Sequence, residues 1–299
     1  MKLKAFFLIL SLILSLSSCQ SKTNKGESKQ SKIENARIDS LDLNIFHSLT
    51  EMAKNSSFDS MTSQDQIIEI GKLFLQTPYV GGTLDVKDKE ELIINLHQLD
   101  CTTYLENVLA FSNVLKQSKA DISSFSKELE KIRYRNGNLT DYSSRLHYFT
   151  DWIFNNEEKG LVTDITQEIG GEPYEKKIDF MSTHINSYPA LVKDSSLIET
   201  IKQTEKEINS RKHFYIPKNR IQSIEKQINN GDFIAITTKI KGLDVSHTGI
   251  AIHINKRLHL MHASSKSKKV VISEIPLAEK IQKNRLQSGI MIVRITSKQ

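Results

Sequence analysis

Long apolar runs and basic clusters are both scarce in this chain of 299 residues. Its one nearly unbroken apolar run, residues 5–16, is shorter than the roughly 20 residues that cross a bilayer as a helix. The formal charge is +6, but lysines and acids are interspersed, and no stripe of Lys and Arg with aromatics between them stands out. We therefore expect no nucleic-acid partner, whereas a modest basic excess suits an anionic envelope polymer.

Cysteine is also scarce, with only Cys19 and Cys101 present. Cys19 follows a positively charged start, the apolar run and Ser17-Ser18, which is the pattern of a signal peptide over residues 1–18. Leu16-Ser17-Ser18-Cys19 is also typical of a lipobox, the bacterial signal for cleavage before a cysteine that receives lipid. We predict a lipid on Cys19 that anchors the protein to a membrane of the cell envelope, in the periplasm or at the outer membrane. The alternative is an ordinary signal peptide that happens to end at a cysteine.

A lipid on Cys19 leaves Cys101 without an intramolecular disulfide partner. An unpaired thiol is prone to oxidation in an oxidising compartment. A thiol that an exported protein nevertheless keeps is therefore a candidate nucleophile. The alternative is a buried cysteine that acts as a small hydrophobic residue.

The rest of the chain shows no internal repeat and no second linker, so we expect one domain over residues 38–299. Residues 19–37 are polar and predict a flexible tether. Helical spacing of apolar residues precedes short β-branched runs, which predicts an α+β domain with helices on one side of a mostly antiparallel sheet. Helices are expected near residues 41–52, 67–74, 102–115, 122–132, 143–154 and 196–208, and strands near 233–236, 248–254, 258–263, 270–272 and 290–295.

Cys101 stands where the helix of residues 102–115 is expected to begin. The positive end of a helix and its unpaired N–H groups favour thiolate over thiol and can stabilise an oxyanion. Asp100 and Thr102 fit a capping role equally well.

A thiolate enzyme also needs a base and a residue that orients it. If Asn255-Lys256 forms a two-residue hairpin turn, Gly249 faces His262, and His247 lies diagonal to His262 on the same face of the sheet. Gly249 and the next residue on that face, Ala251, would leave room for another element. A zinc site formed by both histidines and Cys101 is the alternative, but no compact ligand spacing supports it. We therefore expect no metal and no cofactor.

Several segments resemble the NlpC-type cell-wall cysteine peptidases, and more specifically their N-acetylmuramoyl-L-alanine amidase-like branch. The resemblance runs from Gln76 to Arg294 and includes a helical insertion between Cys101 and His247. The matching segments are residues 77–82, 99–103, 132–137, 144–152, 246–251 and 261–265.

The resemblance implies a papain-like α+β fold, with Cys101 as nucleophile, His247 as base and His262 as the orienting residue. It also implies Tyr79 near the oxyanion or substrate, with Asp100 and Thr102 lining the pocket. In the insertion, five side chains are candidates for gripping the carboxylates and sugar of a muropeptide, or alternatively form a solvated helix face and an aromatic core. These are Arg133, Arg135, Arg145, His147 and Tyr148.

Three functions are compatible with these residues. The first is cleavage of the amide bond between N-acetylmuramic acid and L-alanine in a muropeptide by a monomeric enzyme. The second is an endopeptidase that cleaves the stem peptide after D-glutamate, for which Asp100 could bind the free L-alanine amine. The third is a non-catalytic envelope-binding lipoprotein, which would not need a complete set of Cys101, His247 and His262.

Overall fold

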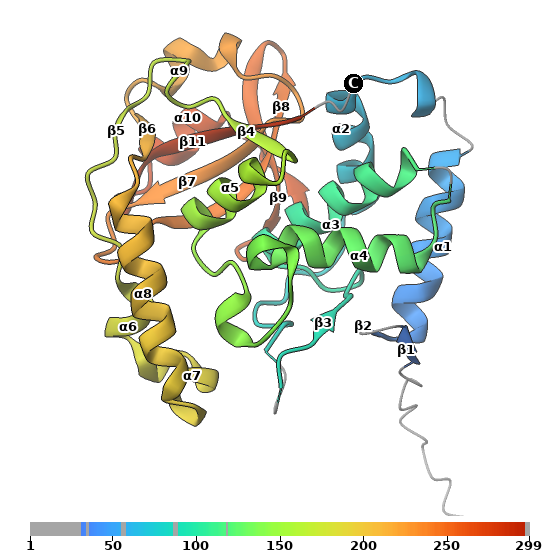
Figure 1. Ribbon diagram of the computed structural model, residues 1–299. Coiled ribbons are helices and arrows are strands. Elements are labelled where there is room, and N and C mark those ends of the chain that lie inside the picture. The colour runs from blue at the N-terminus through green and yellow to red at the C-terminus, as the bar shows by residue number, and fades with distance from the viewer. Residues whose placement is uncertain (1–30, 34–35, 55–57, 86–88, 118, 297–299) are drawn as a thin grey trace, which may run out of the picture.

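The computed structural model describes residues 31–33, 36–54, 58–85, 89–117 and 119–296, and it shows an α+β fold (Figure 1). The predicted signal peptide and Cys19 lie outside the described residues. The helices are α1 (Ser40–Lys54), α2 (Ser63–Leu73), α3 (Cys101–Leu115), α4 (Ile122–Arg133), α5 (Phe149–Glu158), α6 (Phe180–Thr183), α7 (Pro189–Lys193), α8 (Ser196–Ser210), α9 (Ile221–Ile224) and α10 (Leu277–Gln282), with 3₁₀ turns η1 (Phe58–Ser60), η2 (Arg135–Gly137), η3 (Tyr142–Ser144), η4 (Ile185–Ser187) and η5 (Glu225–Gln227).

The main sheet has eight strands in the order β10-β9-β8-β7-β11-β6-β5, with β4 also paired to β11, and all its pairs are antiparallel. A smaller sheet joins β1, β2 and β3, and its β2–β3 pair is parallel. The strands are β1 (Ser31–Ile33), β2 (Ala36–Ile38), β3 (Leu92–Ile93), β4 (Val162–Asp164), β5 (Glu172–Pro173), β6 (Phe214–Pro217), β7 (Phe233–Thr238), β8 (Val245–Ile254), β9 (Arg257–Ser264), β10 (Lys269–Ile272) and β11 (Gln287–Ile295).

Helices cover both faces of the main sheet, so the expectation of helices on one side only is wrong. Ile250 and Ile252 of β8 belong to the large core cluster that contains the buried faces of α1 to α4. Ala251, between them, belongs to a second cluster with Leu260 and the apolar residues of α9 and α10. Because successive side chains of a strand point to opposite faces, β8 is packed on both sides. Figure 1 shows α1 to α4 gathered on one side of the molecule and the main sheet on the other.

The folded domain begins earlier than residue 38, and the insertion is not purely helical. Ala36 and Ile38 are each only 1% exposed in β2, so the predicted tether does not extend to residue 37. The insertion between Cys101 and His247 also contributes β4, β5 and β6 to the main sheet. The helix expected over residues 143–154 begins only at Phe149, because Arg145 is extended and bridges to Tyr134.

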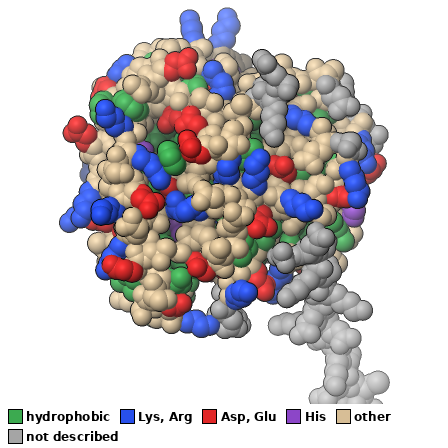
Figure 2. Space-filling model, viewed as in Figure 1, with side chains coloured by type: hydrophobic (Ala, Val, Ile, Leu, Met, Phe, Trp, Pro, Cys, Tyr) green, Lys and Arg blue, Asp and Glu red, His purple; other side chains and the backbone are tan. Residues whose placement is uncertain are grey.

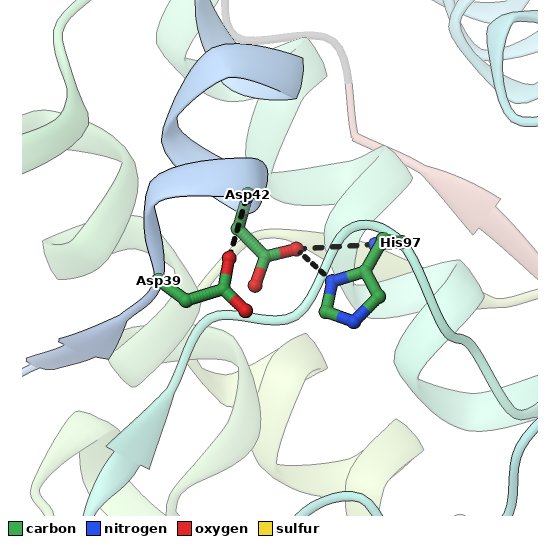
Figure 3. A group of neighbouring side chains, drawn as sticks. All are labelled: Asp39, Asp42 and His97. Carbon is green, nitrogen blue, oxygen red and sulfur yellow. Dashed lines mark hydrogen bonds and ion pairs between the residues drawn. The ribbon is translucent and has the colours of Figure 1, made fainter. Parts of the chain in front are cut away.

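A buried carboxylate ties α1 to the segment that leads into α3. Oδ1 of Asp42, a residue that is 2% exposed, accepts hydrogen bonds from the Leu96 and His97 N–H groups and lies 2.7 Å from His97 Nδ1. Asp39 completes a group of three possible metal-ligating residues, and its Oδ1 accepts from the Asp42 N–H (Figure 3). Hydrogen bonds thus account for this carboxylate without an ion, and we assign the group to the anchoring of α1.

The surface carries charges of both signs. Figure 2 shows acidic and basic side chains interspersed over the face in view. None of the helices in the described part of the chain is long and apolar enough to span a membrane.

Candidate active site

The start of α3 is fixed by a capping box. Asp100 Oδ1 accepts hydrogen bonds from the N–H groups of Thr102 and Thr103, at 3.0 and 2.8 Å, and the Thr103 hydroxyl accepts from the Asp100 N–H. Asp100 therefore has the capping role that the sequence left as an alternative to pocket lining. Neither of the two bonds to Asp100 Oδ1 uses the N–H of Cys101, the first residue of the helix.

Cys101 is joined to β8 by a hydrogen bond from Thr248. The Thr248 hydroxyl donates a 2.8 Å hydrogen bond to the Cys101 carbonyl oxygen, and Thr248 also acts to lower the pKa of the nearby thiol. Thr248 precedes the isoleucines that pack against the α3 side of the sheet, and the next residue back is His247, which lies at an irregularity in the β7–β8 pairing. Gly249 and Ala251 were expected to leave room for another element on their face of the sheet, and α10 packs there against Ala251.

The predicted histidine pair is present. The Asn255-Lys256 turn has positive φ at both residues, and it sets Ile254 opposite Arg257, which confirms the predicted hairpin register. His247 Nε2 and His262 Nδ1 lie 2.6 Å apart, with the rings edge to face. Gly249 permits this approach, because a Cβ there would lie 2.9 Å from the Cβ of His262.

The thiol and both imidazoles of the site are uncharged at neutral pH. Burial, and then the charge of Asp100, raise the pKa of the Cys101 thiol to about 11, against the hydrogen bonds from Thr248 and Thr102. Burial and the charge of Lys280 lower the pKa of His247 to about 4, and burial, His247 and Lys280 lower that of His262 to about 2. The sequence predicted a thiolate at the helix terminus, but burial outweighs the helix dipole.

Tyr79 lies beside the thiol, at the start of the glycine loop. Its N–H donates to the Lys268 carbonyl, and it forms a parallel bridge with Leu99, which precedes the Asp100 cap. Burial raises the pKa of the Tyr79 phenol, and so do the charges of Cys101 and Asp100, as expected for a ring close to both. The predicted nucleophile, the capping residue and Tyr79 therefore lie close together.

Two of the five predicted substrate-gripping residues are buried and belong to the core. Arg133 is 1% exposed, and it donates to Glu106 and to the Ile93 carbonyl, both at 2.7 Å. Tyr148 is 3% exposed, and its hydroxyl donates to Glu205 and accepts from the Met181 N–H. Because both side chains are buried and bonded to protein groups, the prediction that they grip substrate is wrong.

Replacing Arg133 with methionine should lower the free energy of unfolding by about 3–5 kcal/mol, since it leaves the Glu106 carboxylate buried without its partner. Urea denaturation followed by circular dichroism measures this loss. Lys131→Met, on the same helix, is the matched control and should change stability by less than about 0.5 kcal/mol. Adding Glu106→Gln to Arg133→Met should restore part of the loss, and equal stability of wild type and Arg133→Met would contradict this account of the ion pair.

The other three candidates are also bonded within the protein. Arg135 pairs with Asp151, at 2.5 Å, and His147 Nε2 lies 2.7 Å from the Tyr142 carbonyl, with the His147 pKa lowered to about 3 mainly by burial. Arg145 pairs with Glu90 at 2.6 Å. Arg145 also lines a cavity of about 730 Å³, together with Asp85 and Glu90.

The family of this chain follows from its match to a protein-family model. Residues 69–290 match the AmiA-like family model, described as N-acetylmuramoyl-L-alanine amidase-like. The chain belongs to this family. The family is one of amidase-like peptidoglycan hydrolases, so this chain is an amidase-like hydrolase. Peptidoglycan is the substrate that the family implies. No curated protein is significantly similar in sequence.

Solved structures of family relatives agree with this assignment. An N-acetylmuramoyl-L-alanine amidase from Bacteroides uniformis is 37% identical, covers 79% of this chain and 99% of its own, and superposes with a TM-score of 0.75. A Bacteroides fragilis protein provisionally named a xylanase is 39% identical over 75% of this chain and 98% of its own, with a TM-score of 0.71. A Legionella pneumophila protein, 24% identical over 85% of this chain and 95% of its own, shares the fold with a TM-score of 0.64.

Two residues of the amidase-like site were missed from the sequence, Thr248 and Lys280. In the sequence, Thr248 resembled an ordinary strand residue, although its position directly after His247 could have indicated that it belongs to the site. Lys280, whose Nζ lies 2.8 Å from His262 Nε2, had none, because only the packing of α10 on β9 brings it there.

Proposed function

We propose that this protein is a cysteine amidohydrolase with an NlpC-type, papain-like catalytic core. It cleaves the amide bond between N-acetylmuramic acid and the L-alanine of peptidoglycan stems. The proposal is carried by one observation: Cys101, at the start of α3, is bonded to Thr248 through its carbonyl oxygen, and the adjacent His247 is bonded to His262.

In the proposed reaction, His247 takes the thiol proton as the sulfur attacks the carbonyl carbon, and then gives it to the departing L-alanine amine. Water hydrolyses the resulting thioester with His247 again as the base. Because the thiol pKa is raised to about 11 and the His247 pKa is lowered to about 4, thiol and imidazole are both neutral before substrate binds. Proton transfer therefore accompanies the attack and does not precede it.

The oxyanion that forms during the attack needs donors that are not already used. The N–H groups of Thr102 and Thr103 are committed to Asp100, so the N–H of Cys101 is the donor that the start of α3 offers. The Tyr79 hydroxyl supplies the second, since burial keeps its phenol protonated and its ring adjoins the sulfur.

The state of Asp100 favours the amidase over the endopeptidase. An endopeptidase of the stem needs a carboxylate for the free L-alanine amine. Here Asp100 Oδ1 accepts hydrogen bonds from two N–H groups and lies 2.9 Å from the Thr103 hydroxyl. A cap so engaged is a poor site for an ammonium group, whereas a muramoyl amide does not require one.

The complete set of Cys101, His247 and His262 also favours an enzyme over a binding protein, which needs no activated thiol. A glycosidase, as the provisional name of the Bacteroides fragilis relative suggests, usually needs two carboxylates that flank the scissile bond. Asp100 is the acid beside Cys101, and it is engaged as a cap.

Mass spectrometry of a defined disaccharide-tetrapeptide incubated with the protein tests the proposal. We expect the free disaccharide and the intact tetrapeptide with a new L-alanine amino terminus. Release of L-alanyl-D-glutamate would establish the endopeptidase instead, and an unchanged muropeptide in the presence of folded protein would remove the catalytic proposal.

For location, we propose export by the signal peptide of residues 1–18 and a lipid on Cys19, which leave a monomer anchored in the cell envelope. Cys19→Ser should move the protein from the membrane pellet to the soluble fraction, since no described helix spans a membrane. Immunoblotting of both fractions measures this shift, with Ser21→Ala as the matched control. A pelleted Cys19→Ser variant would contradict the lipid anchor.

A further inference from the structure

The hydrogen-bonded chain of the site does not end at His262. Lys280 of α10 places its Nζ 2.8 Å from His262 Nε2, so three side chains stand in line: His247, His262 and Lys280. The side chain of Lys280 is partly buried, and no acid in the described part of the chain is paired with it.

The charged groups around Lys280 come from few elements. Lys266, in the turn between β9 and β10, adds a second positive charge. Glu279, next to Lys280 on α10, is paired with Arg257. Of the other elements packed on α10, α9 has no charged residue, and Arg294 of β11 is paired with Asp232. Burial, and then the charge of Lys266, lower the pKa of Lys280 to about 8.

The direction of each hydrogen bond follows from Lys280. An ammonium group can only donate, so a charged Lys280 makes His262 Nε2 an acceptor and leaves its proton on Nδ1. That Nδ1–H then donates to His247 Nε2, and the His247 proton sits on Nδ1. Because His262 occupies Nε2, Nδ1 is the nitrogen of His247 that is left to act as a base. It carries a proton and has no lone pair to act as a base.

We propose that Lys280 is a positioning residue that gates the catalytic histidine, holding it in the inactive tautomer while charged and releasing it when neutral. A neutral amine accepts the His262 Nε2–H, both rings change tautomer, and His247 Nδ1 becomes a base. Loss of the positive charge also favours the imidazolium that forms when His247 takes the thiol proton. The catalytic role of this gate rests on the proposed function, but the contacts among His247, His262 and Lys280 do not depend on any substrate.

Imidazole nitrogen shifts of the wild-type protein test the gate without any substitution. Two-dimensional spectra that correlate ring carbon-bound protons with ¹⁵N distinguish the two tautomers of each histidine. Between about pH 6.5 and pH 9.5, on either side of the Lys280 pKa of about 8, His262 should change from the Nδ1–H to the Nε2–H tautomer, and His247 should follow. A His262 that keeps one tautomer throughout overturns the proposal.

Alkylation of Cys101 by iodoacetamide tests the consequence, since it reports thiol reactivity with no muropeptide present. Lys280→Met should raise the rate at about pH 6.5 on the order of tenfold, the effect of about one pKa unit, and should remove the rise that wild type shows near pH 8. Lys280→Arg keeps a permanent donor and should stay slow throughout. Lys283→Met, exposed at the end of the same helix, should match wild type.

Quantifying the Cys101 peptide by mass spectrometry keeps the result separate from alkylation of Cys19. Equal alkylation profiles for wild type, Lys280→Met and Lys280→Arg overturn the gate. The expected profiles without any muropeptide cleavage would support the gate and reject the proposed function. Muropeptide cleavage together with equal alkylation profiles for wild type, Lys280→Met and Lys280→Arg would support the proposed function and reject the gate.

Discussion

Cys101→Ser is expected to lower the rate of muropeptide cleavage on the order of 10⁴-fold or more, because removing the nucleophile of a coupled catalytic set abolishes almost all of its activity. Serine keeps the shape of the side chain, but its hydroxyl is far less acidic than a thiol, and a neutral His247 of lowered pKa is too weak a base to activate it. Single-turnover assays with excess enzyme and mass detection of the free stem peptide measure the loss.

The stability of this variant separates chemistry from folding. The Asp100 cap and the bond from Thr248 to the Cys101 carbonyl do not involve the sulfur, so Cys101→Ser should unfold within a few degrees of wild type. Cys19→Ser, the variant of the other cysteine, should keep full activity on soluble muropeptide. Wild-type turnover by Cys101→Ser would reject the cysteine mechanism.

His247→Gln should lose about 10²–10⁴-fold in kcat/KM, the usual contribution of a general acid–base residue. His247 moves the proton in both halves of the proposed reaction, and glutamine cannot. His262→Asn should lose much less, since an amide can still accept from His247 Nε2, the atom that His262 contacts at 2.6 Å. His262 is thus a positioning residue, and its variants should change the pH profile more than the maximal rate.

The two losses are compared in one assay, as kcat/KM for the disaccharide-tetrapeptide over the range of about pH 6 to pH 10. His253→Gln, on the same strand, controls for a general effect of histidine replacement, because His253 is bonded to Asn230 and Glu225 away from the pair. Equal inactivity of folded His247→Gln and His262→Asn would show that the division of roles is wrong. Full activity of His247→Gln would place the base elsewhere.

Helix and strand positions were predicted better than the faces they bury. The expected helix of residues 41–52 is α1, but Leu41 and Met52 are 50% and 55% exposed, while Asp42 is buried. Apolar spacing placed Leu49 correctly but Leu41 and Met52 wrongly, since it could not anticipate that Asp42 would bond to the Leu96 and His97 N–H groups. The two-residue strands β3 and β5 carry too few residues for any periodicity and were missed, whereas β10, with four residues, was predicted.

The sequence alone determined the residues that local rules govern. A helix that begins at Cys101 follows from Asp100 and Thr103, and the approach of His247 to His262 follows from the Asn255-Lys256 turn, because capping and hairpin register depend only on neighbouring residues. The tertiary structure alone decided what surrounds them. It buried Arg133 against Glu106, covered the histidine face with α10, and set Lys280 against His262. Burial and charge from residues distant in the chain set the protonation of the site, and no local pattern in the sequence encodes them.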